Sequence, residues 1–316
     1  MPMIDTLYKI YTVLALAAAC ALSAGALFAA LRERRRRGHD AILRAKYLHA
    51  SMLALSGDEG RMPYFPLFGR YGTRLLLCET VAGLVSITYG LNTALLRRAI
   101  DRYGLDRWML RHLRRCRGYR RARALALLAC LPSDETMAAA VAPYLRSRNR
   151  YVRFYALTVQ LAADPAHALR YIESYADPLS ASEVAELMAL LRRGILPLAY
   201  GPLLESRSPN LRRVGLAIVR QFGIGEAEGR LLQFVADTSE PELGREALYA
   251  LCSLRCSLLR REVAVFIAGM DLRERRALLR CMALEGYALN TMQRLFEDEE
   301  RPYYETLVQS YKRSLA

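Results

Sequence analysis

The chain has 316 residues, enough to bury a sizeable core, and 53% of them are hydrophobic. Alanine and leucine dominate and runs of strand-favouring residues are scarce, which predicts a helical protein. The formal net charge is +15, with arginine supplying all but three of the 46 basic residues, and seven scattered cysteines exclude a disulfide framework and predict reduced core thiols.

An apolar run follows a short N-terminal segment, residues 1–9. Residues 10–31 carry no charge, and 22 helical residues at about 1.5 Å each can cross the roughly 30 Å hydrocarbon layer of a bilayer. Five arginines and one glutamate follow directly at 32–37. The positive-inside rule therefore predicts a single-pass protein of the inner (plasma) membrane, with its N-terminus outside and its C-terminal domain in the cytoplasm.

The apolar segments allow two other interpretations. A cleaved signal peptide needs its basic region before the apolar run, but here the basic block follows it. A second span at 80–96 also lacks charge, but it contains several polar side chains and has arginines at both ends, which favours a packed helix. Residues 32–73 are then expected to form a basic juxtamembrane segment.

Residues 74–289 contain an internal repeat. An arginine recurs with apolar or small residues three and four positions later, as in Arg153 followed by Ala156 and Leu157. The interval is 30 to 32 residues, which fits two short helices and two turns. The repeated positions are Arg121, Arg153, Arg213, Arg245 and Arg275, with Glu183 in the slot between Arg153 and Arg213.

Each unit is predicted to have a first amphipathic helix, a polar turn and a second helix that carries the arginine near its start. The expected first helices include 135–145, 166–175, 226–236 and 260–269. No unit can bury its apolar stripe alone, so neighbouring units must stack. Gly194 and Pro197 predict an irregular stretch where the stack bends, and residues 290–316 are expected to form a helical cap that ends in a helix at 303–314.

The pattern resembles the HEAT-repeat family, most closely in the stretch from Tyr151 to Leu157, and the resemblance covers residues 107–285. It implies an all-α fold: a right-handed α-solenoid of about six HEAT-like helix pairs behind one N-terminal transmembrane helix. Membrane-anchored bacterial proteins of this family look similar.

The five arginines have two interpretations. They can grip an anionic ligand, or they can form a structural repeat ladder, because in HEAT-like units this arginine usually binds an acidic residue or a carbonyl in a neighbouring turn. We expect the ladder. Its candidate partners are the turn aspartates Asp134, Asp164, Asp237 and Asp271.

The densest basic stretch is 97–123. Within it, Arg107, Arg111, Arg114 and Arg115 can share one helix face and form an anionic-surface patch. Anionic lipid headgroups suit such a patch, and so do nucleic-acid phosphates. The predicted anchor favours lipid over nucleic acid, and a solvated face without a ligand is the third interpretation.

No catalytic constellation, metal site or cofactor site is expected. The four histidines are dispersed, Cys252 and Cys256 have no second pair to complete a zinc site, and Gly223 and Gly225 follow a helix and not a strand. The sequence therefore favours a non-enzymatic, membrane-tethered scaffold for a protein partner.

By analogy with the family, the partner would be an envelope or polysaccharide synthesis or export complex. The alternative is a nucleic-acid-binding protein or DNA glycosylase-like enzyme that uses the 97–123 face. A HEAT-like bilin lyase is a third comparison, but no chromophore-handling residue matches. The oligomeric state is not predicted.

Overall fold

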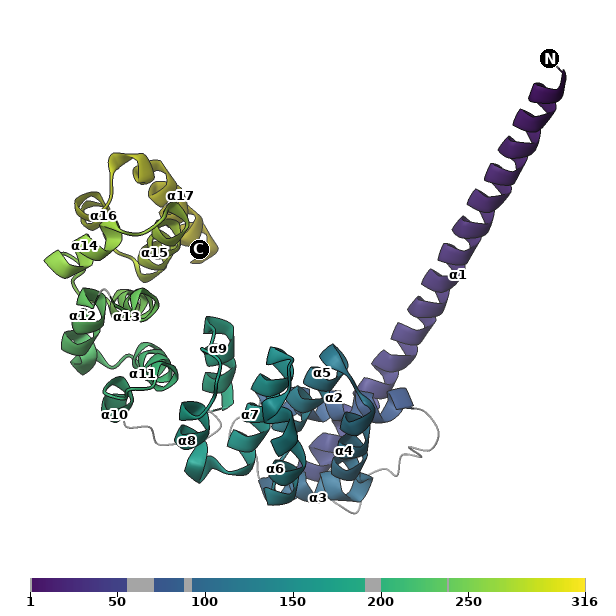
Figure 1. The fold of residues 1–316 in the computed structure, drawn as a ribbon, viewed down its shortest axis with the longest axis horizontal. Coiled ribbons are helices and arrows are strands. Elements are labelled where there is room, and N and C mark those ends of the chain that lie inside the picture. The colour runs from purple at the N-terminus through teal and green to yellow at the C-terminus, as the bar shows by residue number, and fades with distance from the viewer. Residues whose placement is uncertain (1, 56–70, 88–92, 191–199, 238, 316) are drawn as a thin grey trace. The chain divides into compact units, whose positions relative to one another are not determined.

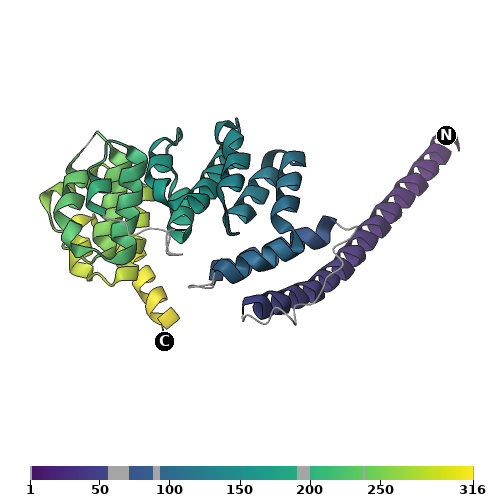
Figure 2. The same ribbon diagram turned by 90° about the horizontal axis from the view of Figure 1, so that it is seen from below.

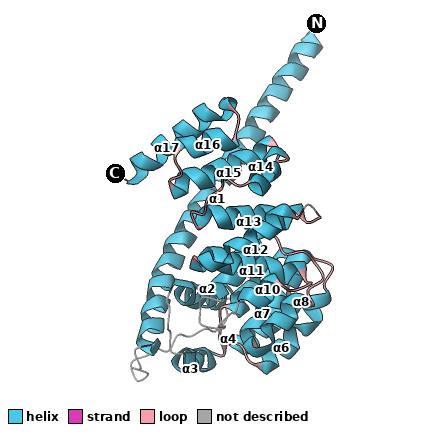
Figure 3. Cartoon of the chain, turned by 90° about the vertical axis from the view of Figure 1, so that its left-hand side faces the viewer, coloured by secondary structure: helices cyan, strands magenta, loops and turns pink. Residues whose placement is uncertain are grey.

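The computed structural model describes residues 2–55, 71–87, 93–190, 200–237 and 239–315. It is 83% helical, and no strand occurs among the residues that it describes (Figure 3). The expected all-α class is confirmed. The chain divides into two compact units: residues 1–114 with 130–132, and residues 115–129 with 133–316.

The first unit contains the longest helix, α1 (Pro2–Leu55), followed by α2 (Tyr71–Ile87), α3 (Thr93–Tyr103) and α4 (Leu105–Arg115). The C-terminal part of α1 packs against α2 and α3, where it buries Tyr47 and Ala50 (Figure 2). In α3, Arg97 forms ion pairs with Asp101 and Asp106 and donates a hydrogen bond to a backbone carbonyl at residue 132.

The predicted membrane anchor is contradicted. In the described part of the chain, no helix is both long enough and apolar enough to cross a membrane. Residues 10–31 are not a separate helix, because α1 continues through the arginine block to Leu55 (Figure 1).

The side chains of residues 10–21 lie outside the described residues. Because no described helix can cross a membrane, the predictions of a single-pass topology, an outside N-terminus and an inner-membrane location are wrong. Residues 56–70 of the predicted juxtamembrane segment at 32–73, and residues 88–92 of the alternative span at 80–96, also lie outside the described residues.

The second unit is a succession of short helices. In chain order these are α5 (Gly118–Ala129), α6 (Glu135–Val141), α7 (Arg150–Ala163), α8 (Ala168–Glu173), α9 (Ala181–Leu190), α10 (Tyr200–Leu204), α11 (Pro209–Phe222), α12 (Glu228–Ala236), α13 (Pro241–Ser253), α14 (Arg261–Ala268), α15 (Leu272–Glu285), α16 (Leu289–Leu295) and α17 (Arg301–Leu315). The odd-numbered helices pack each against the next, from α5 to α17, and Figure 3 shows α11, α13 and α15 in successive layers.

Local sequence explains where these helices begin and end. Asn149 caps α7 by accepting a hydrogen bond from Val152 N, and Asp271 forms a reciprocal capping box with Glu274 in α15. Pro209 opens α11, where its missing N–H is not needed. Gly223 closes α11 with a φ of 66°, a left-handed conformation that suits a residue without a Cβ.

Two apolar clusters hold the second unit together. One joins α7, α8, α9 and α11 around buried residues such as Phe154 and Val214, and the other joins α11 to α17 around residues such as Leu248 and Met282. The stretch at 191–199, where Gly194 and Pro197 predicted an irregularity, lies outside the described residues.

Candidate functional site

The repeated arginines lie near the starts of the odd-numbered helices, and four of them bind a carboxylate that follows in the chain. Arg153 makes two hydrogen bonds of 2.7 and 2.8 Å to the Asp177 carboxylate, and Arg275 lies 3.2 Å from Glu300. Arg213 binds Glu242, and Arg245 binds Glu274. These pairs link residues 24 to 29 positions apart, so each contact crosses from one helix pair to the next. Arg121 instead lies over the Tyr144 ring, 5.0 Å from its centre.

The four turn aspartates that the sequence suggested as partners of the repeated arginines bind other groups. Asp134 and Asp271 cap α6 and α15. Asp164 accepts hydrogen bonds from His167 and Tyr171, and Asp237 accepts them from Ser239. Short aspartate side chains bind groups that are close in the chain, such as the backbone at a helix start, more readily than a distant arginine.

Glu183, which stands where the other helix pairs have the repeated arginine, takes part in two interactions. It forms a capping box with Ser180, and it accepts hydrogen bonds of 2.6 and 3.1 Å from Arg150 of the preceding repeat. Burial opposes its ionisation, but the hydrogen bonds from Arg150 and Ser180 outweigh that effect and lower the pKa of Glu183. An ion pair between neighbouring helix pairs is therefore kept at this position, but here the later helix supplies the acid, Glu183, and the earlier helix supplies the arginine, Arg150.

A buried amide provides a further inter-repeat contact. Asn210, at the start of α11, is 5% exposed. Its side chain accepts a hydrogen bond from Leu179 N at 2.8 Å and donates to the carbonyls of Tyr175 and Asp177. One side chain thus satisfies three backbone groups of the preceding turn.

The main candidate site is a groove of about 650 Å³ on the second unit. Helices α9, α11 and α13 line it, and α15 contributes Glu285. Small side chains, including Ala181, Ala185 and Ala217, leave open space in its wall, and the buried Val184, Met188 and Leu216 lie at its base, so that the lining mixes apolar and polar groups. Its polar rim consists of Arg220, Gln221, Glu246, Tyr249, Ser253 and Glu285.

The carboxylate of Glu246 is the most perturbed acid of the groove. Burial raises its pKa to about 7, and Glu242 adds to this effect, although the positive charge of Arg213 opposes it. Arg213 Nε lies 3.5 Å away, while the two terminal nitrogens of the same guanidinium donate hydrogen bonds to Glu242 and to the Leu179 carbonyl. Arg213 therefore balances the negative charge of the Glu246 carboxylate only weakly, and a cation that entered the groove would stabilise the ionised form of Glu246.

The predicted basic patch lies on α4. Arg107, Arg111, Arg114 and Arg115 are all exposed, while Met109 and Leu113 are buried on the other side of the helix. Arg111 Nε donates to the Arg107 carbonyl, and among the described residues none of the four arginines has an acidic partner. Trp108 stacks on His112 at 5.3 Å. The preference for lipid over nucleic acid rested on the predicted anchor and loses that support.

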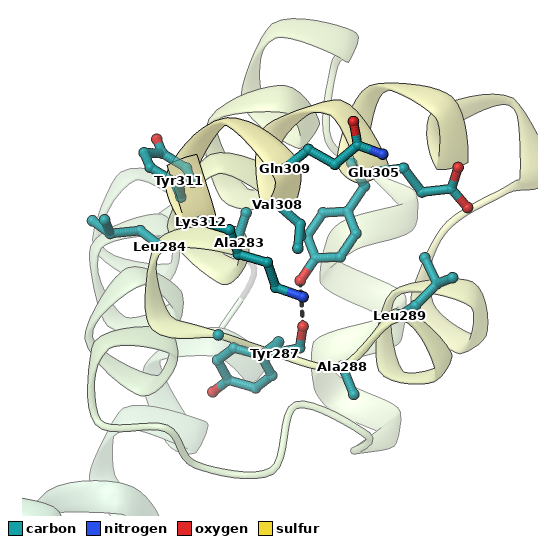
Figure 4. Close-up of a pocket in the computed structure, with 12 residues that line it drawn as sticks. Ala283, Leu284, Tyr287, Ala288, Leu289, Glu305, Val308, Gln309, Tyr311 and Lys312 are labelled. Carbon is teal, nitrogen blue, oxygen red and sulfur yellow. Dashed lines mark hydrogen bonds between the residues drawn. The ribbon is translucent and has the colours of Figure 1, made fainter. Parts of the chain in front are cut away.

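A second cavity, of about 590 Å³, lies between α15, α16 and α17 (Figure 4). Two tyrosines are fixed within it: Tyr304 donates a 2.7 Å hydrogen bond to the Tyr287 carbonyl, and Tyr287 donates to the Cys256 carbonyl. Burial raises the pKa of Tyr304 to about 12, so both phenols act as neutral donors. Val308 and Leu284 supply apolar walls, and Figure 4 places Lys312 among the lining residues.

Within the described part of the chain, no group of three or more histidine, cysteine or acidic side chains is arranged to hold a metal ion. No protein-family model, curated protein or solved structure matches the chain. Sequence reasoning missed the alanines of the groove. Their signal was the helical spacing of small residues, as at 181 and 185, beside the apolar positions 184 and 188 on the same face of α9.

Proposed function

We propose that this chain is a protein-interaction scaffold, built as a solenoid of HEAT-like helix pairs, that holds a segment of a partner protein in the groove. The order of helix contacts supports the solenoid. Helices α7, α9, α11, α13 and α15 each follow a shorter helix and pack on one another, and ion pairs join successive pairs. Stacked repeats of this kind create extended surfaces for binding.

The observation that carries the proposal is the groove itself. Three successive second helices and Glu285 of a fourth line it, its wall is rich in alanine, and its rim carries charged and polar side chains. This combination suits a peptide segment that packs small apolar side chains against Ala181 and Ala185 and places a basic side chain near Glu246. No set of groups for acid–base or nucleophilic chemistry accompanies it among the residues described, which favours binding over catalysis.

The test is affinity capture of the tagged full-length chain from total cell extract, with groove variants beside the natural protein. Ala185→Arg places a long charged side chain in the groove, and Glu246→Lys reverses the charge at its rim. Ala264→Arg is the matched control, because Ala264 is an exposed residue of α14 that does not line the groove.

We expect one partner set with the natural protein and with Ala264→Arg, and loss of that set with both groove variants. The purified partner should then bind Ala185→Arg at least about tenfold more weakly, which corresponds to about 1.4 kcal/mol. Equal capture by Ala185→Arg and the natural protein would refute the groove as the binding site.

The exposed arginines of α4 favour a second candidate function, binding of nucleic-acid phosphates. The test is the affinity for duplex DNA and RNA over a salt series. Binding at about 50 mM salt that weakens steeply with salt, and that falls in Arg107→Ala/Arg111→Ala but not in an Arg261→Ala/Arg273→Ala control, would support it. The absence of binding at low salt would remove it.

A further inference from the structure

The cavity between α15, α16 and α17, which we call the C-terminal cavity, has no part in the proposed function. Its volume of about 590 Å³ lies within the range of about 300–1,000 Å³ that is usual for small-molecule sites. None of the described residues that line it also lines the groove. The C-terminal cavity is therefore a separate candidate site, large enough to hold a small molecule.

The walls of the C-terminal cavity are mainly apolar. Helix α15 contributes Ala283 and Leu284, α16 contributes Leu289, and α17 contributes Val308. The side chain of Leu284 is 64% exposed although it is aliphatic. A ligand with a hydrocarbon chain would cover Leu284 and remove apolar surface from water, which favours binding.

The tyrosine hydroxyls of the C-terminal cavity already have acceptors. Tyr304 is 1% exposed and donates a 2.7 Å hydrogen bond to the Tyr287 carbonyl. The Tyr287 hydroxyl donates a 2.7 Å hydrogen bond to the Cys256 carbonyl. Because both hydroxyl protons are used, the deep part of the cavity does not need an acceptor from a ligand and suits an apolar group.

The charges of the lining are unequally balanced. Glu305 and Lys312 both line the cavity, and Glu305 is paired with Arg301 at 2.9 Å. Lys312 is exposed and has no acidic partner in the part of the chain that the structure describes. Figure 4 shows its side chain extending from α17 towards the Tyr287 backbone. The lining therefore offers one unbalanced positive charge beside an apolar wall.

We propose that the C-terminal cavity binds an aliphatic carboxylate, with its hydrocarbon chain against Leu284, Leu289 and Val308 and its carboxylate at the Lys312 amine. A negative head group is favoured because the Lys312 ammonium donates stronger hydrogen bonds to an anion than to a neutral group. A hydrocarbon chain is favoured over a sugar or a nucleotide because the walls are mainly apolar. This inference goes beyond the proposed scaffold and does not depend on it.

The experiment titrates the full-length protein with decanoate at low salt and follows binding by isothermal titration calorimetry. Decylamine is the comparison ligand, because it has the same length of hydrocarbon chain and a positive head group. We expect decanoate to occupy one site per chain and to bind at least about tenfold more tightly than decylamine. Added salt should weaken the binding of decanoate, because Lys312 is exposed.

Variants locate the site. Lys312→Gln should weaken the binding of decanoate about tenfold, while Lys46→Gln, at an exposed lysine of α1, should leave it unchanged. Val308→Trp fills the C-terminal cavity and should abolish binding. Its matched control is Val265→Trp, because Val265 is 64% exposed on α14 and does not line the cavity. Circular dichroism and thermal unfolding check that each variant folds.

A second measurement uses the natural protein alone. Acetic anhydride modifies exposed lysines, and mass spectrometry measures the rate at each one. Decanoate should slow the acetylation of Lys312 several-fold and leave that of Lys46 unchanged. Equal affinity for decanoate and decylamine, unchanged binding in Val308→Trp, or no binding of decanoate at all would overturn the proposal.

Discussion

Asn210 provides the sharpest test of how the repeats are joined. Replacing it with alanine removes the amide that accepts from Leu179 N and donates to the carbonyls of Tyr175 and Asp177. Leu179 is 1% exposed and Tyr175 is 9% exposed, so water cannot readily replace the lost bonds to these two residues. The Asp177 carbonyl belongs to a partly exposed residue and is easier to hydrate.

The magnitude follows from the number of groups left without a partner. A buried donor or acceptor that loses its only partner costs about 1–3 kcal/mol, and Asn210→Ala leaves two such groups in a buried environment. We therefore expect a loss of about 2–5 kcal/mol in the free energy of unfolding. The exposed Asn290 of α16 is the matched control, and Asn290→Ala should change it by less than about 0.5 kcal/mol.

The assay combines urea unfolding, followed by far-UV circular dichroism, with hydrogen exchange at the Leu179 amide. Exchange is informative because an array of repeats can open locally without unfolding completely. In Asn210→Ala, the Leu179 amide should lose protection while amides in α15 retain theirs. A loss of less than about 1 kcal/mol together with unchanged protection of Leu179 would refute the role assigned to Asn210.

Three further predictions concern single positions. Gly244→Ala should cost about 1–3 kcal/mol in thermal or urea unfolding, because the new Cβ would lie 2.7 Å from the Phe266 ring and 3.1 Å from the Phe234 carbonyl. Gly229→Ala, with nothing within 4 Å, should be neutral or stabilising by up to about 1 kcal/mol, and equal costs for the two would contradict this packing. The pKa of Glu246 is raised from 4.5 to about 7, so its contribution to stability is present below 4.5 and is lost as the pH rises towards 7. Glu246→Gln should therefore be more stable than the natural protein near pH 8, by at most about 3 kcal/mol, with little gain near pH 4; a constant difference across a pH series would contradict the shift. Asp271→Ala should cost about 1 kcal/mol in urea unfolding through loss of the capping box, and no cost would show that the cap contributes nothing.

Much of the helical order could be predicted from the sequence. The expected first helix at 226–236 corresponds to a short 3-10 turn and α12, and the one at 260–269 corresponds to α14. The final helix expected at 303–314 lies within α17. Local signals such as prolines at helix starts, glycines at helix ends and the spacing of apolar residues are sufficient for this, because they act over a few residues.

Long-range partners were harder to predict. The turn aspartates were expected to bind the repeated arginines because they lie in the turns between helices. Four of the arginines instead bind acids in the following helix pair, namely Asp177, Glu242, Glu274 and Glu300. Which acid meets which arginine depends on how each helix pair rotates against the next, and one sequence does not specify that rotation.

The membrane anchor was predicted from an uncharged run and a following basic block. That argument treats residues 10–31 as an independent element, whereas they belong to a helix that continues to Leu55. The absence of charge in a window does not reveal where a helix ends. The prediction is contradicted because, in the part of the chain that the structure describes, no helix is both long and apolar enough to cross a membrane.

The most direct test of the scaffold account places a photo-crosslinking amino acid at position 185, in the groove, and at position 264, on α14, in the full-length chain within cells. The account predicts a discrete covalent adduct with one protein from position 185 and none from position 264. That protein should also be the one lost in affinity capture with Ala185→Arg. No adduct from position 185, or the same adducts from both positions, would contradict binding through the groove.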